Sequence, residues 1–235
     1  MQYMGGKSRI GKKLGVILNE YLEGKLDFVE PFVGGFNIVP HVETTGRIEC
    51  GDANCALIHL YTAIQNGWTP PKDVSREEYL RAKALPDTNP MKAFCGFGVS
   101  FSGKWFGGYA TRQDRNYATN CYNALAKKAE HIKRAGLWNC DYFEIWNYDM
   151  PQSVIYCDPP YEGTTGYDGA KGFNHSQFWD WCAHMARRHY VFVSEYRCPV
   201  SHRVVFEKEQ TTTVSRDKTK YAKATEKMFL CEGFE

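Results

Sequence analysis

Apolar residues along this chain recur at two spacings, one typical of helices and one typical of strands. Between positions 8 and 23 they return every three to four residues, which predicts an amphipathic helix with Ser8 as its N-cap. Residues 25–38 read as a strand, a tight glycine turn and the start of a helix, and residues 46–54 as a short strand ending in an acid. Residues 56–67 predict another helix. This alternation implies an α/β fold with a parallel sheet and right-handed crossovers.

The alternation stops at the proline-containing segment 69–74. Beyond it, residues 75–85 and 118–135 predict helices. The stretch between these helices, 94–117, mixes glycines with aromatic and basic side chains. We therefore expect residues 70–137 to form a small, mostly helical insert.

Strand patterns return after the insert. They lie at 137–145, 153–157 and 189–196, with a helix around 175–188. The main domain would therefore be built from residues 1–69 and 138–235.

The composition excludes several classes of protein. With 43% apolar and 15% aromatic residues among 235, the chain can bury a sizeable core and lacks the polar bias of a disordered protein. Its nine cysteines include no C-x-x-C pair and its seven histidines show no ligand spacing, so we expect a reduced protein without a bound metal. There is no run of about 18 apolar residues, and the N-terminal residues lack the apolar core of a signal peptide. These features favour a soluble, cytoplasmic protein without a membrane partner.

Charge is unevenly distributed, although the net charge is only +2. Residues 70–137 hold 12 Lys and Arg against 6 Asp and Glu, whereas residues 26–69 hold 1 against 5. A basic segment beside an acidic one suggests that one part binds a polyanion while the other binds something else. A solvated basic surface is the simpler alternative.

A stiff turn follows the strand expected at 153–157. The strand runs directly into Asp158, two prolines and Tyr161. Pro159 and Pro160 cannot donate to a sheet, and each restricts the residue before it to extended geometry. Ligands of open α/β sheets bind beyond the carboxyl ends of the strands, so this turn would present a carboxylate, carbonyl groups and an aromatic ring to a ligand. A turn that only ends the strand is the alternative.

Acids also end other expected strands. Glu30 precedes Gly34 and Gly35, which allow close backbone approach. Asp52 follows 22 residues after Glu30, at the place where nucleotide-binding folds keep an acid for ribose hydroxyls, and Asp141 ends the strand after the insert. Each acid alone could be a helix cap, and the glycines could serve only a tight turn. Their occurrence at successive strand ends favours a ligand site.

Five short motifs occur in the order YMGGKSR, EPFVGG, GDAN, CDYF and CDPPYEG. Together they resemble the Dam-type DNA adenine-N6 methyltransferases, and the likeness covers essentially the whole chain. D-P-P-Y alone is not specific, since some ribosomal RNA methyltransferases share it, but its pairing with an upstream E-P-F-x-G is. The family's glycine turn often reads G-x-G, whereas this chain has Val33-Gly34-Gly35-Phe36.

The resemblance implies a Rossmann-like methyltransferase core that uses S-adenosylmethionine and carries a DNA-recognition insert, in a bacterial cell or a phage-infected host. An adenine flipped out of double-stranded DNA would be methylated on N6. Asp158 and the Pro159 carbonyl would accept the two N6–H bonds, and Tyr161 would stack on the base. The catalytic residues implied are Asp158, Pro159, Pro160 and Tyr161.

The resemblance also implies binding residues. The cofactor site would comprise Tyr3, Lys7, Glu30, Pro31, Phe32, Gly34, Gly35, Asp52, Asp141, Tyr142 and Asp158. The DNA-binding residues expected in the insert are Lys104, Trp105, Arg112 and Arg115. About half of the insert's aromatic rings should instead form its core.

Three alternatives remain open. The same chemistry could act on RNA or on cytosine N4, for which S-P-P-Y would be more usual, or the chain could bind DNA without turnover. The N-terminal G-G-K element and the long insert favour the DNA adenine interpretation, and the intact D-P-P-Y argues against an inactive relative. The oligomeric state stays open, and the sequence is compatible with a monomer.

Overall fold

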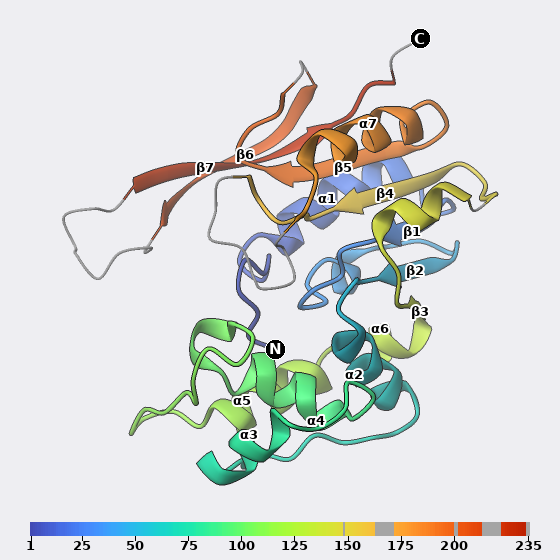
Figure 1. Cartoon of the computed structure of the whole chain (residues 1–235). Helices are drawn as coiled ribbons and strands as arrows, with labels where there is room; N and C mark the ends of the chain where they lie inside the picture. The colour runs from blue at the N-terminus through green and yellow to red at the C-terminus, as the bar shows by residue number, and fades with distance from the viewer. Residues whose placement is uncertain (148, 163–171, 200–201, 213–221, 234–235) are drawn as a thin grey trace.

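In the computed structural model the chain folds around one mixed β-sheet (Figure 1). The structure describes residues 1–147, 149–162, 172–199, 202–212 and 222–233. The strands found there are β1 Asp27–Glu30, β2 Ile48–Gly51, β3 Gly136–Trp138, β4 Ser153–Cys157, β5 Tyr190–Glu195, β6 Arg203–Thr212 and β7 Ala222–Leu230. In space they follow the order β3-β2-β1-β4-β5-β7-β6.

The first five strands are parallel and follow the order 3-2-1-4-5 of doubly wound, Rossmann-type sheets. This confirms the expected α/β, Rossmann-like core. Strand β7 then pairs antiparallel with β5, and β6 forms the edge. The sequence analysis did not predict β6 and β7, in which charged residues interrupt the apolar pattern.

Helices lie on both faces of the sheet and in the region between β2 and β3. They are α1 Gly11–Leu22, α2 Cys55–Gln65, α3 Arg76–Ala82, α4 Pro90–Ala93, α5 Tyr117–Ala126, α6 Ala129–Arg134 and α7 His175–Met185. None of the helices in the described ranges is long and apolar enough to cross a membrane.

Two local expectations about helices are wrong. Ser8 is not the N-cap of α1, because the N–H groups of Ile10 and Gly11 both donate to the Lys7 carbonyl and a turn precedes the helix. No α-helix starts at the glycine turn: Phe36 takes a φ of 56°, and only a 3₁₀ turn, Val39–His41, follows. The glycine turn therefore has no α-helix N-terminus to offer to an anion.

Two other expected elements are shorter than the sequence suggested. The single helix expected at 118–135 divides into α5 and α6 at residues 127–128. The strand expected at 137–145 stops at Trp138, and a 3₁₀ helix, Tyr142–Asn147, follows it.

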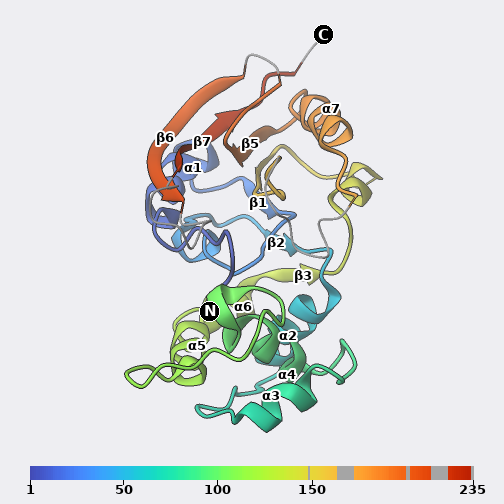
Figure 2. The same cartoon turned by 60° about the vertical axis from the view of Figure 1, so that its left-hand side comes forward.

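Alternating strand residues bury the two faces of the sheet against different helices. Phe28, Val154, Tyr156 and Phe192 belong to the cluster that contains the apolar side of α1. The neighbours of these residues, such as Val29, Ile155 and Val191, belong to the cluster around α7. Figure 2 shows α1 and α7 on opposite sides of the sheet. Burying each large apolar side chain fully contributes about 1.5–3 kcal/mol to the free energy of folding. Packing on both faces of the sheet therefore holds the strand ends in fixed positions.

The helical region between β2 and β3, which includes α2, packs below the sheet in Figure 1 and belongs to the same core cluster as α1. Phe94 and Phe97 are fully buried in that core, and Trp105, Phe106 and Tyr109 pack partly against it. Phe101 is 65% exposed. Two of these six rings are thus fully buried and three more contact the core, so the core involves more of them than the half expected.

Candidate active site

The parallel strands bring acidic side chains to one edge of the sheet, because their carboxyl ends coincide there. Glu30 ends β1, Asp52 follows β2, Asp158 follows β4 and Glu195 ends β5. Glu226 joins them from the antiparallel β7, where the next residue pairs with Glu195 in register. Sequence reasoning identified Glu30, Asp52 and Asp158 but missed Glu195, at the end of an expected strand, and Glu226.

The closest ionic contact at this edge joins Lys7 to Asp158. The Lys7 Nζ lies 2.6 Å from Oδ1 and 2.7 Å from Oδ2 of Asp158, and it also donates to the Gly5 carbonyl at 3.0 Å. Lys7 is only 6% exposed and Asp158 19%. Burial lowers the pKa of Lys7, but the Asp158 and Glu226 carboxylates outweigh that effect and raise it. Burial raises the pKa of Asp158, while Lys7 opposes the shift, and the two short contacts indicate that the pair is ionised.

Tyr161 extends the same cluster. Its ring lies 4.8 Å from the Lys7 Nζ, and its hydroxyl donates to Glu226 Oε1 at 3.1 Å. The Tyr161 and Tyr196 rings meet edge to face, with 4.8 Å between their centroids. Glu195 accepts from the backbone N–H of Glu162 at 3.0 Å, and burial raises the pKa of Glu195 to about 7. The D-P-P-Y turn is therefore fixed by side chains from β5, β7 and the N-terminal segment.

The glycine turn after β1 is organised around Asp52. Its Oδ2 accepts from the Gly34 N–H at 3.0 Å and its Oδ1 from the Asn54 N–H at 2.9 Å, while the Tyr61 hydroxyl donates to the Gly34 carbonyl at 2.6 Å. Burial raises the pKa of Asp52 to about 6, although both backbone hydrogen bonds oppose the shift. These bonds fix the carboxylate and leave part of its acceptor capacity for a ligand.

Tyr3 connects the glycine turn to the helical region. A Cβ on Gly34, which has a φ of 45°, would lie 3.0 Å from the Tyr3 ring, and a Cβ on Gly103 would lie 2.7 Å from the Tyr3 nitrogen. The Tyr3 ring also packs on Phe97 at 4.8 Å between centroids, and Phe97 packs on Trp105 at 4.7 Å. Two expected binding residues, Tyr3 and Trp105, thus belong to one row of rings.

Lys128, which sequence reasoning did not single out, makes a second connection from the helical region. Its Nζ donates to the Gly35 carbonyl and to Asn37 Oδ1, both at 2.7 Å. Burial lowers the pKa of Lys128 to about 8, while the Glu30 carboxylate opposes the shift. Burial raises the pKa of Glu30 well above its usual range, and its Oε2 has no hydrogen-bond partner within the described part of the chain.

Other expected cofactor residues lie in or beside an aromatic cluster. Phe32 stacks on Tyr142 at 5.5 Å, and the Tyr142 ring is buried against Phe178 and Trp181. Tyr142 is therefore a core residue whose side chain has little exposed surface for a ligand. Pro31 is also buried.

Asp141 is exposed and accepts from the backbone N–H of Phe143 at 2.9 Å. The structure thus gives it the helix-capping role that the sequence had left open. Nearby, the side chain of Asn139 donates to the Asp52 carbonyl at 2.8 Å, so this turn lies next to the glycine turn.

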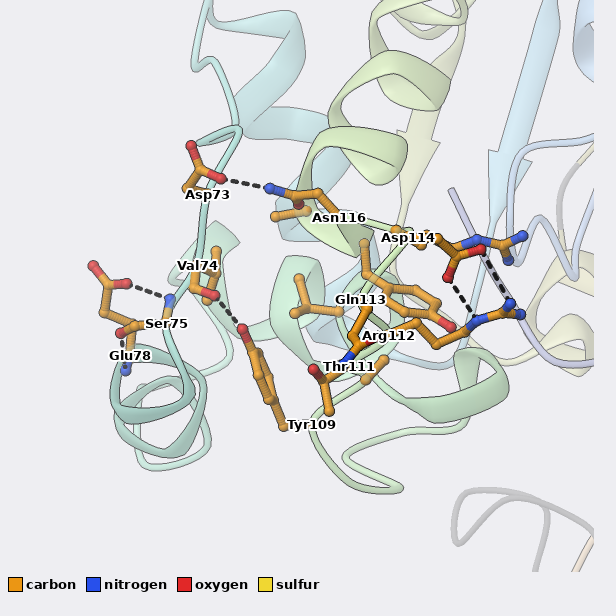
Figure 3. A pocket seen from close by; sticks show the side chains of 15 residues that line it. Asp73, Val74, Ser75, Glu78, Tyr109, Thr111, Arg112, Gln113, Asp114 and Asn116 are labelled. Atoms are coloured by element: carbon orange, nitrogen blue, oxygen red, sulfur yellow. Dashed lines mark hydrogen bonds and ion pairs between the residues drawn. The ribbon is translucent and has the colours of Figure 1, made fainter.

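The expected DNA-binding residues form two groups. Lys104 is exposed and directly follows Gly103, next to Tyr3. Arg112 and Arg115 flank an exposed two-residue turn. This turn borders a groove of about 680 Å³ that also contains Asp73, Glu78 and Tyr109 (Figure 3).

Within that groove most polar groups already have partners. Arg112 forms an ion pair with Asp114 at 3.0 Å, the Tyr109 hydroxyl donates to the Val74 carbonyl, and Glu78 completes a capping box with Ser75. The Arg115 guanidinium lies 5.8 Å from the Tyr117 ring. Among the described residues no group of three or more His, Cys, Asp and Glu side chains could hold a metal ion. The sequence offers the basic stretch 215–223 as an alternative DNA-binding segment, and residues 215–221 of it lie outside the described residues.

Comparisons with known proteins give structural likeness only. No family model matches the sequence, and no curated protein is significantly similar to it. Among solved structures, the chain is similar to yhhF from Escherichia coli, described as a candidate methyltransferase (8% identity, TM-score 0.43, 96% of this chain and 86% of that one). It is also similar to an rRNA methylase from Streptococcus thermophilus (8%, 0.40, 94% and 95%) and to SMU.472, a candidate methyltransferase complexed with SAH (10%, 0.38, 98% and 54%). Because these TM-scores lie below 0.5, the function has to be argued from the site itself.

The fit of Tyr3 against the glycine turn predicts a difference between two glycine variants. Gly34→Ala and Gly24→Ala both place a side chain at positive φ, which costs about 1–2 kcal/mol. Only Gly34→Ala also pushes on a ring, since a Cβ at Gly24 meets nothing within 4 Å. We expect Gly34→Ala to lower the free energy of unfolding more than Gly24→Ala does in urea denaturation. Equal losses would show that the Tyr3 ring adjusts without cost.

Proposed function

We propose that this chain is an S-adenosylmethionine-dependent methyltransferase that methylates the N6 amino group of adenine in double-stranded DNA. The observation that carries the proposal is the D-P-P-Y turn at the sheet edge, where the buried Lys7 fixes Asp158. The glycine turn, in which the Gly34 N–H donates to Asp52, lies at the same edge of the sheet. This combination supports a nucleoside-containing methyl donor on one side and a reacting amino group on the other.

The residues at the edge fit S-adenosylmethionine. Asp52 keeps acceptor capacity that suits two ribose hydroxyls, and the acids around it favour a positively charged sulfonium. Beside the glycine turn, the partly buried Lys128 could pair with the carboxylate of a methionine moiety, and the unpartnered Oε2 of Glu30 could accept from its ammonium, which would favour the ionised form of Glu30. When bound there, S-adenosylmethionine would supply the methyl group.

The D-P-P-Y turn would hold the amino group that receives the methyl. A carboxylate has about four acceptor positions, and Lys7 occupies two of those on Asp158, so Asp158 can still accept an N6–H. The Pro159 carbonyl would accept the second N6–H, which favours a tetrahedral nitrogen with an available lone pair. The Tyr161 ring would stack on the base. Positioning and fixed acceptors would therefore account for most of the rate enhancement.

Exposed basic residues in the helical region support DNA as the substrate. Lys104 lies close to the row of rings that begins at Tyr3. Arg115 lies beside the Tyr117 ring, whereas Arg112 is paired with Asp114. We propose that residues 70–137 contact the duplex around the flipped adenine. RNA and cytosine N4 remain the competing substrates for the same chemistry.

Identifying the methylated base tests the proposal directly. The protein is incubated with S-adenosylmethionine and mixed-sequence duplex DNA or RNA, and the products are digested to nucleosides for mass spectrometry. N6-methyladenine in DNA is the expected result. Methyl groups found only in RNA, or only on cytosine N4, would show that the proposed substrate is wrong and identify the true one.

Removing the Asp158 carboxylate should affect turnover more than removing the Tyr161 ring. Asp158→Asn keeps the shape of the side chain but loses the charged acceptor, so we expect turnover to fall on the order of 100-fold. Tyr161→Ala should weaken base stacking by roughly 1–3 kcal/mol. Single-turnover rates and circular dichroism of both variants provide the check. Normal turnover by a folded Asp158→Asn variant would exclude this role for Asp158.

Asp52 should make cofactor binding depend on pH. Its pKa is raised to about 6, so the carboxylate becomes protonated as the pH falls below that value and loses an acceptor. We expect the affinity for S-adenosylmethionine to weaken by up to about tenfold per pH unit below 6. Asp52→Ala should weaken binding by roughly 1–3 kcal/mol at pH 7.5 and remove this pH step. Calorimetry on the two proteins from pH 5 to 8 measures both effects, and an unchanged step in Asp52→Ala would assign it elsewhere.

Variants of the basic residues in the helical region should differ in how strongly their affinity for DNA depends on salt concentration. Lys104→Ala should weaken all DNA equally and flatten the slope of log K against log salt by about one unit, because one phosphate contact is lost. Arg115→Ala should instead relax the choice of one base, at roughly 1–3 kcal/mol. Arg112→Ala should have the smaller effect, because Asp114 already pairs with this arginine. Methylation-site mapping with salt titrations distinguishes the three variants, and three wild-type profiles would place recognition elsewhere.

A further inference from the structure

A buried carboxylate on β7 contacts two residues of the proposed active site but comes from a part of the chain that no motif includes. Glu226 is 6% exposed. Its Oε1 lies 3.2 Å from the Lys7 Nζ and accepts from the Tyr161 hydroxyl at 3.1 Å. One oxygen atom therefore contacts both residues that flank Asp158.

The sheet does not require an acid at this position. A buried charge in the middle of a strand costs stability unless it is paired, and apolar residues of similar volume usually serve a core as well or better. Lys7 already has a partner in Asp158 at 2.6 Å, so Glu226 places a second negative charge beside one buried cation. Such an arrangement suggests that Glu226 sets the positions of its neighbours.

We infer that Glu226 is a positioning residue of the methyltransferase site, which fixes the Lys7 ammonium and the Tyr161 ring around Asp158. This inference rests on the proposed function. The Tyr161 ring is held by the hydroxyl bond to Glu226 and by an edge-to-face contact with Tyr196. Its orientation is thus fixed before a base arrives. The second contact of Lys7 prevents the ammonium from following Asp158 when that carboxylate turns toward an amino group.

Several titratable groups surround this contact. They are Asp158 after β4, Glu195 at the end of β5, Glu30 at the end of β1, and the phenols Tyr156, Tyr161 and Tyr196. The charge of Glu226 raises the pKa of both Lys7 and Asp158. Removing that charge should therefore lower both pKa values.

The test compares Glu226→Gln with Glu207→Gln, which removes the same charge from an exposed position on β6. We expect Glu226→Gln to lower kcat by roughly 10- to 100-fold through misplacement of the reacting groups, with KM for S-adenosylmethionine changed less than twofold. The acidic limb of its kcat profile should move to lower pH, because Asp158 loses a like charge. Glu207→Gln should match the wild type in all three respects. Glu226→Asp, which restores the charge, should recover the wild-type pH profile in part.

A second measurement does not depend on activity. In protein labelled with ¹³Cε-lysine, the Lys7 resonance, assigned by its loss in Lys7→Arg, should titrate at lower pH in Glu226→Gln than in the wild type. An unchanged Lys7 titration in a folded Glu226→Gln variant would overturn the inference. If instead the wild type methylates no DNA while Lys7 responds as expected, the proposed substrate is wrong and the contact stands.

Discussion

The ion pair between Lys7 and Asp158 is the contact on which the arrangement of the site depends. It joins residues 151 positions apart in the sequence and closes the N-terminal segment over the end of β4. Two charges at 2.6 Å in a buried position are stable only if both remain, because removing one leaves an uncompensated charge. The folding of the first ten residues is therefore coupled to the chemistry at the D-P-P-Y turn.

The sheet order explains why so many carboxyl groups meet at this edge. Parallel strands end at the same side, so Glu30, Asp52, Asp158 and Glu195 come together from four separate segments. Burial raises the pKa of each of these acids, and Lys7 and Lys128 are the cations that face them within the described structure. Because burial disfavours the ionised form of these acids, a cationic ligand at this edge would stabilise their carboxylates, whereas an anionic ligand would not.

The sequence predicted the parallel core well and the contacts between segments poorly. The strands at β1, β2, β4 and β5 follow from short apolar runs, and the D-P-P-Y turn was recognisable because prolines restrict the backbone in a known way. Glu226 and Lys128 could not be found from local pattern, since their importance comes from neighbours distant in sequence. The surroundings of Tyr142 show the same limit: its motif suggests a ligand residue, and its contacts with Phe32, Phe178 and Trp181 come from segments distant in sequence.

The antiparallel pairing of β7 has a consequence for how the C-terminal hairpin can change. Side chains alternate between the two faces of a strand, so a slip of one residue would turn Glu226 away from Lys7. Depending on its direction, the slip would bring either Lys227 or Thr225 to that position. A single-residue insertion or deletion within the central part of β7 would thus remove the negative charge beside Lys7 and, in one direction, replace it with a positive one. The irregularity between Val204 and Phe206 lies on β6, at the outer edge of the sheet, where an extra residue can be accommodated without changing the register of β7 against β5. A change of length in the outer strand, β6, therefore leaves the site intact, whereas a change of length in the inner strand, β7, disrupts it.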